Sequence, residues 1–191
     1  MGMLSARIIA TAAVLCSGGA LAVQPVKSLY TALDPAACRA VPARGRGVAR
    51  VCEGLPGYPV YVAEGDRGVF LSVGPEPEAR RAAQQTLGAV NTLFEKNGQR
   101  PTVEWRFIVR DGKTVPYATI VRYRTRSRTN SGEVLVVMRV TERDACHVAY
   151  IDALANPDAI VRARRIADTV ARSEPCPDRP RIDGVHGQSP M

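Results

Sequence analysis

The chain contains 191 residues, of which 26 are lysine or arginine and 18 are aspartate or glutamate, and its formal net charge is +8. This length is sufficient for one domain with a substantial hydrophobic core. Beyond residue 22 the sequence has no run of about 18 apolar residues, which excludes a membrane-spanning helix there and predicts a soluble mature protein.

The N-terminal residues have the pattern of a secretory signal peptide. Arg7 precedes an apolar run, and a small-x-small cleavage site follows at residues 20–22. A lipid anchor on Cys16 is disfavoured because the large residue Leu15 stands directly before it. The predicted organisation is a signal peptide over 1–22, a single domain over 23–176 and a disordered tail over 177–191. We predict a periplasmic or secreted location.

Removal of the signal peptide leaves four of the five cysteines, and an even number in an exported chain predicts disulfides. They form no Cys-x-x-Cys motif, so neither a zinc site nor a redox centre is predicted. Of the three possible pairings we predict Cys38–Cys52 and Cys146–Cys176. The first would close a loop of about 15 residues that is poor in apolar side chains, and such closure stabilises a fold by about 3 kcal/mol.

Two hydrophobic patterns precede residue 100. Residues 58–63 and 69–73 are rich in β-branched and aromatic side chains, and the Gly-Asp-Arg-Gly sequence between them predicts a β-hairpin. Residues 78–96 are predicted to form a helix. Its expected inner face is Ala83, Leu87, Val90 and Phe94, which repeat at helical spacing.

Three strands are predicted over residues 103–109, 117–124 and 133–140, where apolar and polar side chains alternate. This alternation is typical of an antiparallel sheet that is covered on one face. Parity limits the register of the first two strands, because their inward-facing residues must lie opposite one another. A three-residue loop at 112–114 satisfies this condition and places Trp105 opposite Val121 and Glu104 opposite Arg122.

The C-terminal part predicts a strand over residues 146–151 and a helix that ends near Arg172. Asn156 is the expected N-cap, and Pro157 would occupy the first helical position. The strand and the helix have similar lengths, so the chain returns and brings Cys176 beside Cys146. The predicted fold class is therefore α+β, with an antiparallel sheet of five or six strands, one inserted helix and one C-terminal helix.

The most distinctive local feature is a series of arginines at alternate positions: Arg122, Arg124, Arg126 and Arg128. Alternate residues of a strand share a face, and Arg106 on the neighbouring strand could extend the series. One interpretation is an anion-binding surface for lipid headgroups, polysaccharide, nucleic acid or an acidic protein. The other, more general, is a solvated face that blocks aggregation of an exposed strand.

Catalytic patterns are weak. His147 is expected to be a packed or surface residue of a strand, and Glu64 and Asp66 flank a turn. Asp152 ends a strand and is expected to support the following loop. The sequence contains no nucleophile elbow, zinc-protease motif or phosphate-binding loop. We therefore predict no catalytic residue, no metal site and no cofactor.

Several short segments together resemble a family of small exported bacterial proteins of unknown function. The resemblance extends from about Tyr30 to Cys176, and its C-terminal segment is the most specific. It implies export but no activity for any residue. The segments are Cys52-Glu53-Gly54, Gly57-Tyr58-Pro59-Val60, Glu104-Trp105-Arg106, Ala118-Thr119-Ile120-Val121-Arg122-Tyr123, Cys146-His147-Val148-Ala149-Tyr150-Ile151-Asp152 and Ala155-Asn156-Pro157-Asp158-Ala159.

These observations favour a non-catalytic binding or envelope-associated domain with a basic surface. The partners that its charge suits are an acidic protein or an anionic component of the envelope. Two alternatives stay open. One is a hydrolase that uses carboxylates, which requires a pocket in which Glu64, Asp66, Asp152 or His147 converge. The other is an inhibitor of an envelope enzyme.

Overall fold

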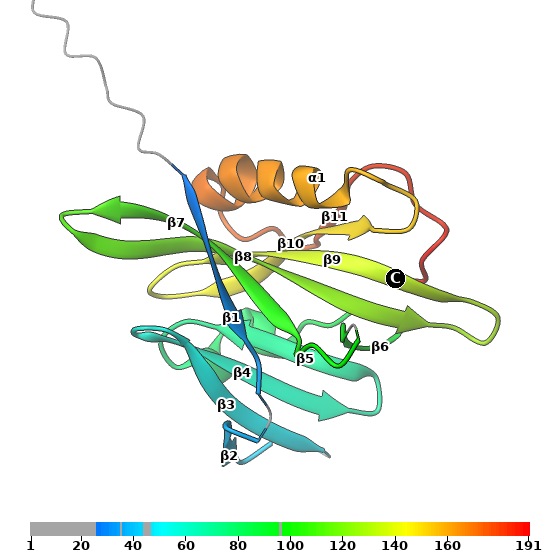
Figure 1. The fold of residues 1–191 in the computed structure, drawn as a ribbon, viewed down its shortest axis with the longest axis horizontal. Coiled ribbons are helices and arrows are strands. Elements are labelled where there is room, and N and C mark those ends of the chain that lie inside the picture. Colours follow the sequence, from blue (N-terminus) through cyan, green and yellow to red (C-terminus); the bar gives the residue numbers. More distant parts are fainter. Residues whose placement is uncertain (1–25, 35, 44–46, 96) are drawn as a thin grey trace, which may run out of the picture.

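The computed structural model describes residues 26–34, 36–43, 47–95 and 97–191. The signal peptide predicted over residues 1–22 lies outside these residues. The described chain forms three layers, in which a seven-stranded sheet lies between a helix and a four-stranded sheet (Figure 1). The protein is therefore richer in strands than the five or six that the sequence predicts.

The larger sheet has the strand order β1-β7-β8-β9-β10-β11, and β6 pairs with β8 beyond the end of β7. Neighbouring strands are antiparallel except β10 and β11, which are parallel. The strands are β1 (Lys27–Ala32), β6 (Val90–Leu93), β7 (Thr102–Arg110), β8 (Lys113–Arg126), β9 (Ser131–Val140), β10 (Ala145–Asp152) and β11 (Arg181–Ile182).

The smaller sheet is an antiparallel meander in chain order. It contains the predicted hairpin, because β4 and β5 pair from Val60 opposite Val73 to Gly65 opposite Gly68. Its strands are β2 (Arg39–Val41), β3 (Val48–Leu55), β4 (Tyr58–Gly65) and β5 (Gly68–Val73).

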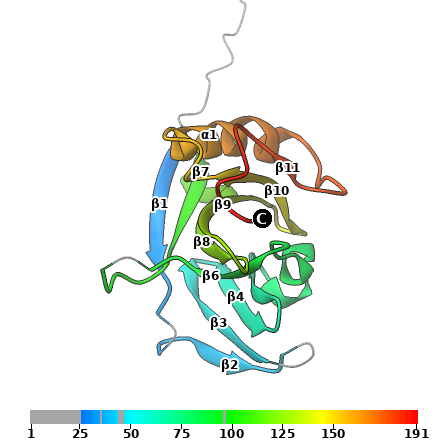
Figure 2. The ribbon, with the colours of Figure 1, turned by 90° about the vertical axis from the view of Figure 1, so that its right-hand side faces the viewer.

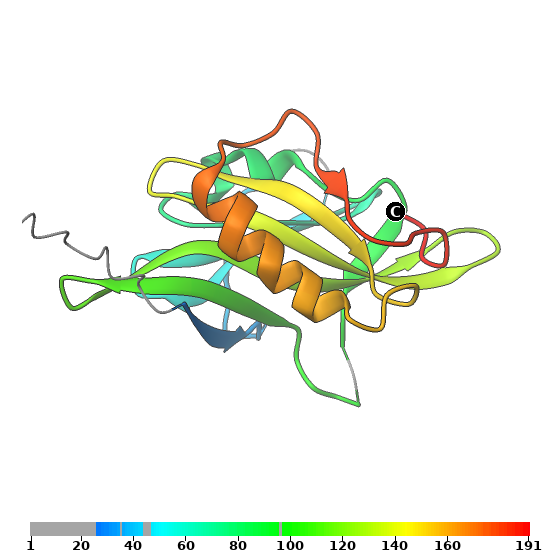
Figure 3. The same cartoon turned by 90° about the horizontal axis from the view of Figure 1, so that it is seen from above.

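Both faces of the larger sheet are buried. Trp105, Val121 and Val136 belong to the core between the two sheets. Ile120 and Ala163 belong to a second core under the helix, which crosses the sheet obliquely (Figure 3). The expectation of one covered face is wrong, because the polar side chains on the second face are buried in ion pairs with the helix rather than exposed to water.

The helix predicted over residues 78–96 is wrong. This stretch forms two short 3-10 turns, η1 (Pro77–Ala79) and η2 (Arg81–Gln84), followed by β6. Ala83 and Leu87 are buried, as their spacing predicted. However, β8 extends past β7 and offers an unpaired edge that β6 fills, and this pairing overrides a helical pattern that Gly88 already weakens.

The register predicted for β7 and β8 is also wrong. The two strands are joined by a two-residue turn at Asp111 and Gly112, whose φ angles are 49° and 72°, and Trp105 lies opposite Thr119. A β-bulge after Arg106 shifts the register by one residue. The prediction assumed that the two strands pair without interruption. Because the bulge adds one residue to the register, a two-residue turn also keeps Trp105 on the core face.

The C-terminal helix is present. It comprises α1 (Ala159–Ile166) and a π-helical continuation, η3 (Ala167–Ala171), which together contain 13 residues. Asn156 does not cap it with its side chain, which binds the backbone of Asp152 and Val185 instead. Both predicted disulfides are confirmed, Cys38–Cys52 and Cys146–Cys176.

Residues 177–191, predicted to be a disordered tail, make defined contacts in the structure. Arg181 and Ile182 form β11 against β10, and the Ser189 side chain is buried. The polar composition of this segment gives no sign of its order, because it is held largely by hydrogen bonds to Asp152 and Asn156, and Met191 is the residue of this segment that packs against the core between the sheets.

Candidate anion-binding site

The structure divides the predicted arginine series among different environments. Arg106 is only 9% exposed and donates two hydrogen bonds to the Asp168 carboxylate, of 2.9 and 2.6 Å. Arg122 forms an ion pair with Glu133 at 2.7 Å. Arg128 lies beyond the end of β8, in the turn to β9. These residues do not form one continuous basic surface.

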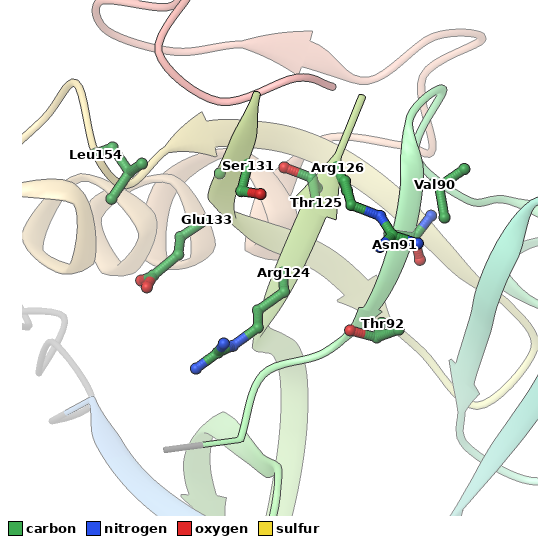
Figure 4. A pocket seen from close by; sticks show the side chains of 10 residues that line it. Val90, Asn91, Thr92, Arg124, Thr125, Arg126, Ser131, Glu133 and Leu154 are labelled. Atoms are coloured by element: carbon green, nitrogen blue, oxygen red, sulfur yellow. The ribbon is translucent and has the colours of Figure 1, made fainter. Parts of the chain in front are cut away.

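Arg124 and Arg126 remain exposed, in a shallow pocket of about 490 Å³ at one end of the larger sheet. Cross-strand pairing places Arg124 between Thr92 and Glu133. The Arg124 guanidinium lies 4.9 Å from the centre of the Phe94 ring. In Figure 4 the Arg124 and Arg126 side chains extend to different sides, and Glu133 lies on the side of Arg124. The pocket therefore combines two divergent cations with one carboxylate.

The charged groups beneath the helix form a closed network. Glu104 accepts hydrogen bonds from Arg164 and Ser28, both at 2.7 Å. Asp168 accepts hydrogen bonds from Arg106 and from the Tyr117 hydroxyl, the latter at 2.7 Å. Burial of Tyr117, followed by its hydrogen bond to Asp168, raises its pKa above the ordinary value. Because these groups satisfy one another, the network fastens the helix to the sheet and is poorly suited to bind a ligand.

A second, more basic pocket of about 610 Å³ lies at the opposite end of β8. It is lined by four arginines against a single carboxylate, that of Glu142. We call it the arginine pocket. Its arginines are Arg110 from β7, Arg139 from β9, Arg143 from the turn after β9 and Arg172 from the end of the helix.

The arginine pocket is partly organised in advance. Arg139 donates a hydrogen bond of 2.7 Å to the Ala171 carbonyl, and the Arg172 guanidinium lies 5.4 Å from the centre of the Tyr117 ring. Arg110 and Arg143 are exposed at the rim. Among the described residues, none of the four guanidinium groups has a carboxylate within ion-pair distance. Their positive charge is therefore available to an incoming anion.

One residue of the smaller sheet, Tyr58, also lines the arginine pocket. Tyr58 contributes from the start of β4, and its pKa is raised by burial and by the nearby Glu142 carboxylate. Sequence reasoning missed this pocket because its four arginines are scattered over residues 110–172 and share no period. The only signal was composition, an excess of arginine without matching acidic residues.

The candidate catalytic residues do not converge. His147 is buried, and burial lowers its pKa to about 3. Asp152 is fully buried and accepts hydrogen bonds from Leu154, Ala155 and the 188–189 segment. Glu64 lines a third pocket, together with Glu95 and Arg124. The pocket that the hydrolase alternative requires is therefore not found in the described part of the chain.

Two further features bear on chemistry. Within residues 26–34, 36–43, 47–95 and 97–191, no group of three or more histidine, cysteine, aspartate or glutamate side chains is placed to hold a metal ion. Nor does any helix in these ranges have the length and apolar character needed to cross a membrane.

Comparisons of the chain with protein-family models, with curated proteins and with solved structures give no match. The resemblance to a family of small exported proteins therefore stays a prediction.

Proposed function

We propose that this protein is an exported, non-catalytic domain that binds an anionic component of the cell envelope through the arginine pocket. The observation that carries the proposal is that four arginines, without carboxylate partners among the described residues, line one pocket. A single surface arginine binds an anion only weakly. Several guanidinium groups in one pocket raise the local positive potential and attract an anion more strongly.

The chemistry of the pocket favours phosphate or sulfate groups. A guanidinium is planar and donates paired hydrogen bonds to two oxygens of the same anion. Arg139 and Arg172 are held by Ala171 and Tyr117, so little of their conformational freedom would be lost on binding. The volume of the pocket lies within the range of small-molecule sites, which suits a compact group with several charges.

Export is supported by the two disulfides, which persist in oxidising compartments. The signal-peptide pattern of residues 1–22 agrees with this location. We infer a periplasmic or secreted protein in which the bonds form after translocation. An intact-mass measurement on protein from the periplasm should show a chain that begins at or near Val23.

The test of the proposed function compares two doubly substituted variants. One carries Arg110→Ser and Arg143→Ser in the arginine pocket, and the other carries Arg124→Ser and Arg126→Ser at the far end of β8. Each variant loses two exposed arginines that have no carboxylate partner in the described structure. Binding of tripolyphosphate is measured by isothermal titration calorimetry at low salt, and thermal unfolding of each variant verifies that the fold is kept.

We expect the pocket variant to bind tripolyphosphate at least tenfold more weakly than the parent, and the control variant less than threefold more weakly. A diffuse basic field predicts equal losses, because both variants lose the same charge. Equal losses, or a larger loss in the control, would contradict the assignment to the arginine pocket. Absence of binding by the parent would overturn the proposal entirely.

A further inference from the structure

A short segment at the end of the chain is held against the larger sheet by two buried side chains. We call residues 183–191 the closing segment. The Asn156 amide binds the backbone N–H and carbonyl of Val185, at 3.0 and 2.6 Å. The Asp152 carboxylate accepts hydrogen bonds from the backbone N–H groups of Gln188 and Ser189 and from the Ser189 hydroxyl, at 2.9, 2.7 and 2.6 Å.

The last residues of the closing segment reach the core between the two sheets. Gly132 lies on β9 in phase with Val134, on the face toward the smaller sheet, and a Cβ atom at Gly132 would lie 2.4 Å from the Ser189 Cβ. Met191 packs against the core between the sheets. Figure 2 shows the segment, in red, curving from the helix layer to end beside β8 and β9. It therefore covers one end of this core.

Two hydroxyls without partners lie in the rows of the sheet that the closing segment reaches. The Tyr123 hydroxyl, the Thr125 hydroxyl and His147 Nε2 are buried and have no hydrogen-bond partner among the described residues. Thr125 pairs with Gly132, and Tyr123 pairs with Val134, so two of the three lie in the rows of the sheet next to Ser189. Burying such a group without a partner destabilises the fold, and hydrophobic packing alone does not explain why these hydroxyls are there.

The closing segment itself is weakly packed. Ser189 is its only fully buried residue, and most of the others are exposed. It is held by polar contacts, which are the hydrogen bonds to Asp152 and Asn156, two bonds between the Ser189 hydroxyl and the Glu133 backbone, and ion pairs of Asp183 with the helix. Segments with few buried apolar contacts detach at low free-energy cost while the sheets stay intact.

We propose that the closing segment is a displaceable plug, and that its withdrawal admits an uncharged apolar ligand with a hydrogen-bonding group to the core between the sheets. Val134, Val136 and Met138 would contact the apolar body of the ligand. The Tyr123 and Thr125 hydroxyls would bind its polar group. This site differs from the arginine pocket in chemistry, since its unpaired groups are neutral and its walls are aliphatic.

The test uses N-phenyl-1-naphthylamine, an uncharged apolar probe with one N–H group, which forms no ion pair with arginine. Binding is measured by fluorescence for the parent and for a variant that lacks residues 186–191. The matched control is Val185→Ser, which changes an apolar side chain of the same segment that is 64% exposed. We expect saturable binding at one site by the shortened variant, at least tenfold tighter than by the parent, because closure lowers the apparent affinity by the fraction of open molecules. The control should bind as the parent does.

A second measurement uses the parent chain and decides the matter if the shortened variant fails to fold. Saturating probe should trap the open form and accelerate hydrogen exchange at the Gln188 and Ser189 amides, at least threefold, while β9 amides stay protected. A folded shortened variant without saturable binding would overturn the proposal. Unchanged or slower exchange at these two amides with probe present would overturn it as well.

Discussion

His147 illustrates how burial changes the chemistry of one residue. The residue is 1% exposed, and its Nδ1 lies 2.9 Å from the Tyr150 hydroxyl. Burial lowers the pKa of the imidazole to about 3, because the charged form would lose its hydration. Between this value and the ordinary pKa of about 6.5, the unfolded chain binds a proton that the folded chain does not. Stability is therefore lost as the pH falls through this window.

The first prediction concerns His147→Gln, which removes this titration. Between about pH 7 and pH 5, the parent should lose about 2 kcal/mol of unfolding free energy through His147, and the variant should lack this part of the decrease. Urea unfolding at the two pH values measures it. His186→Gln, at an exposed histidine, is the matched control and should keep the pH dependence of the parent. Equal decreases in the parent and in His147→Gln would contradict a buried, neutral imidazole.

At the scale of single residues, the sequence predicted the roles of several residues better than it predicted the residues that they contact. The disulfides followed from cysteine number and spacing and are confirmed. Asp152 was expected to support a loop, and its bonds to Leu154 and Ala155 do so. Its bonds to Ser189 could not be foreseen, because that contact joins residues 37 positions apart and depends on the path of an apolar-poor segment.

At the scale of elements, the local sequence pattern was enough to predict a strand or turn where residues close in sequence also pair with one another in space. The hairpin of β4 and β5 is such a case. It failed where a distant strand decided the outcome, as when β6 paired with the free edge of β8 instead of extending a helix. The arginine pocket belongs to the second kind, since it exists only when the ends of β7, β9 and the helix are brought together.

A second prediction tests how the helix is fastened to the sheet. Asp168→Ala removes the carboxylate that pairs with the buried Arg106 and accepts the Tyr117 hydroxyl bond. We expect a loss of roughly 2–4 kcal/mol in unfolding free energy, because the buried Arg106 charge then keeps only its longer ion pair with Glu104, at 3.8 Å, and the partial exposure of Asp168 moderates the loss. Chemical denaturation measures it.

The control for this prediction is the same substitution at the start of the helix. Asp158→Ala removes a carboxylate that pairs with Arg162 and is 54% exposed. Surface pairs of this kind contribute little, so the variant should unfold close to the parent. If Asp158→Ala destabilised the protein as much as Asp168→Ala, the network beneath the helix would not be the fastening that the structure indicates.

At the scale of the whole molecule, each disulfide belongs to a different part of the layered fold. Cys38–Cys52 ties the entry of the smaller sheet to β3. Cys146–Cys176 joins β10, in the middle layer, to the chain that leaves the helix layer. Cys146 is fully buried in the core under the helix, whereas Cys38 is only partly buried. The second bond therefore restrains the position of a layer, and the first restrains a local connection.

The third prediction follows from this difference. Replacing Cys146 and Cys176 by serine should lower the unfolding free energy more than replacing Cys38 and Cys52. Loop entropy alone gives about 3.7 kcal/mol for the longer closure and about 3 kcal/mol for the shorter one. The two losses of unfolding free energy should differ by more than these loop-entropy values do. The reason is that Cys146→Ser also places a hydroxyl without a hydrogen-bond partner in an apolar core. Guanidinium unfolding of the two variants, each with the other disulfide verified by thiol alkylation, measures both losses. A greater loss from the Cys38–Cys52 replacement would mean that ordering the smaller sheet, rather than docking the helix, limits the stability of the molecule.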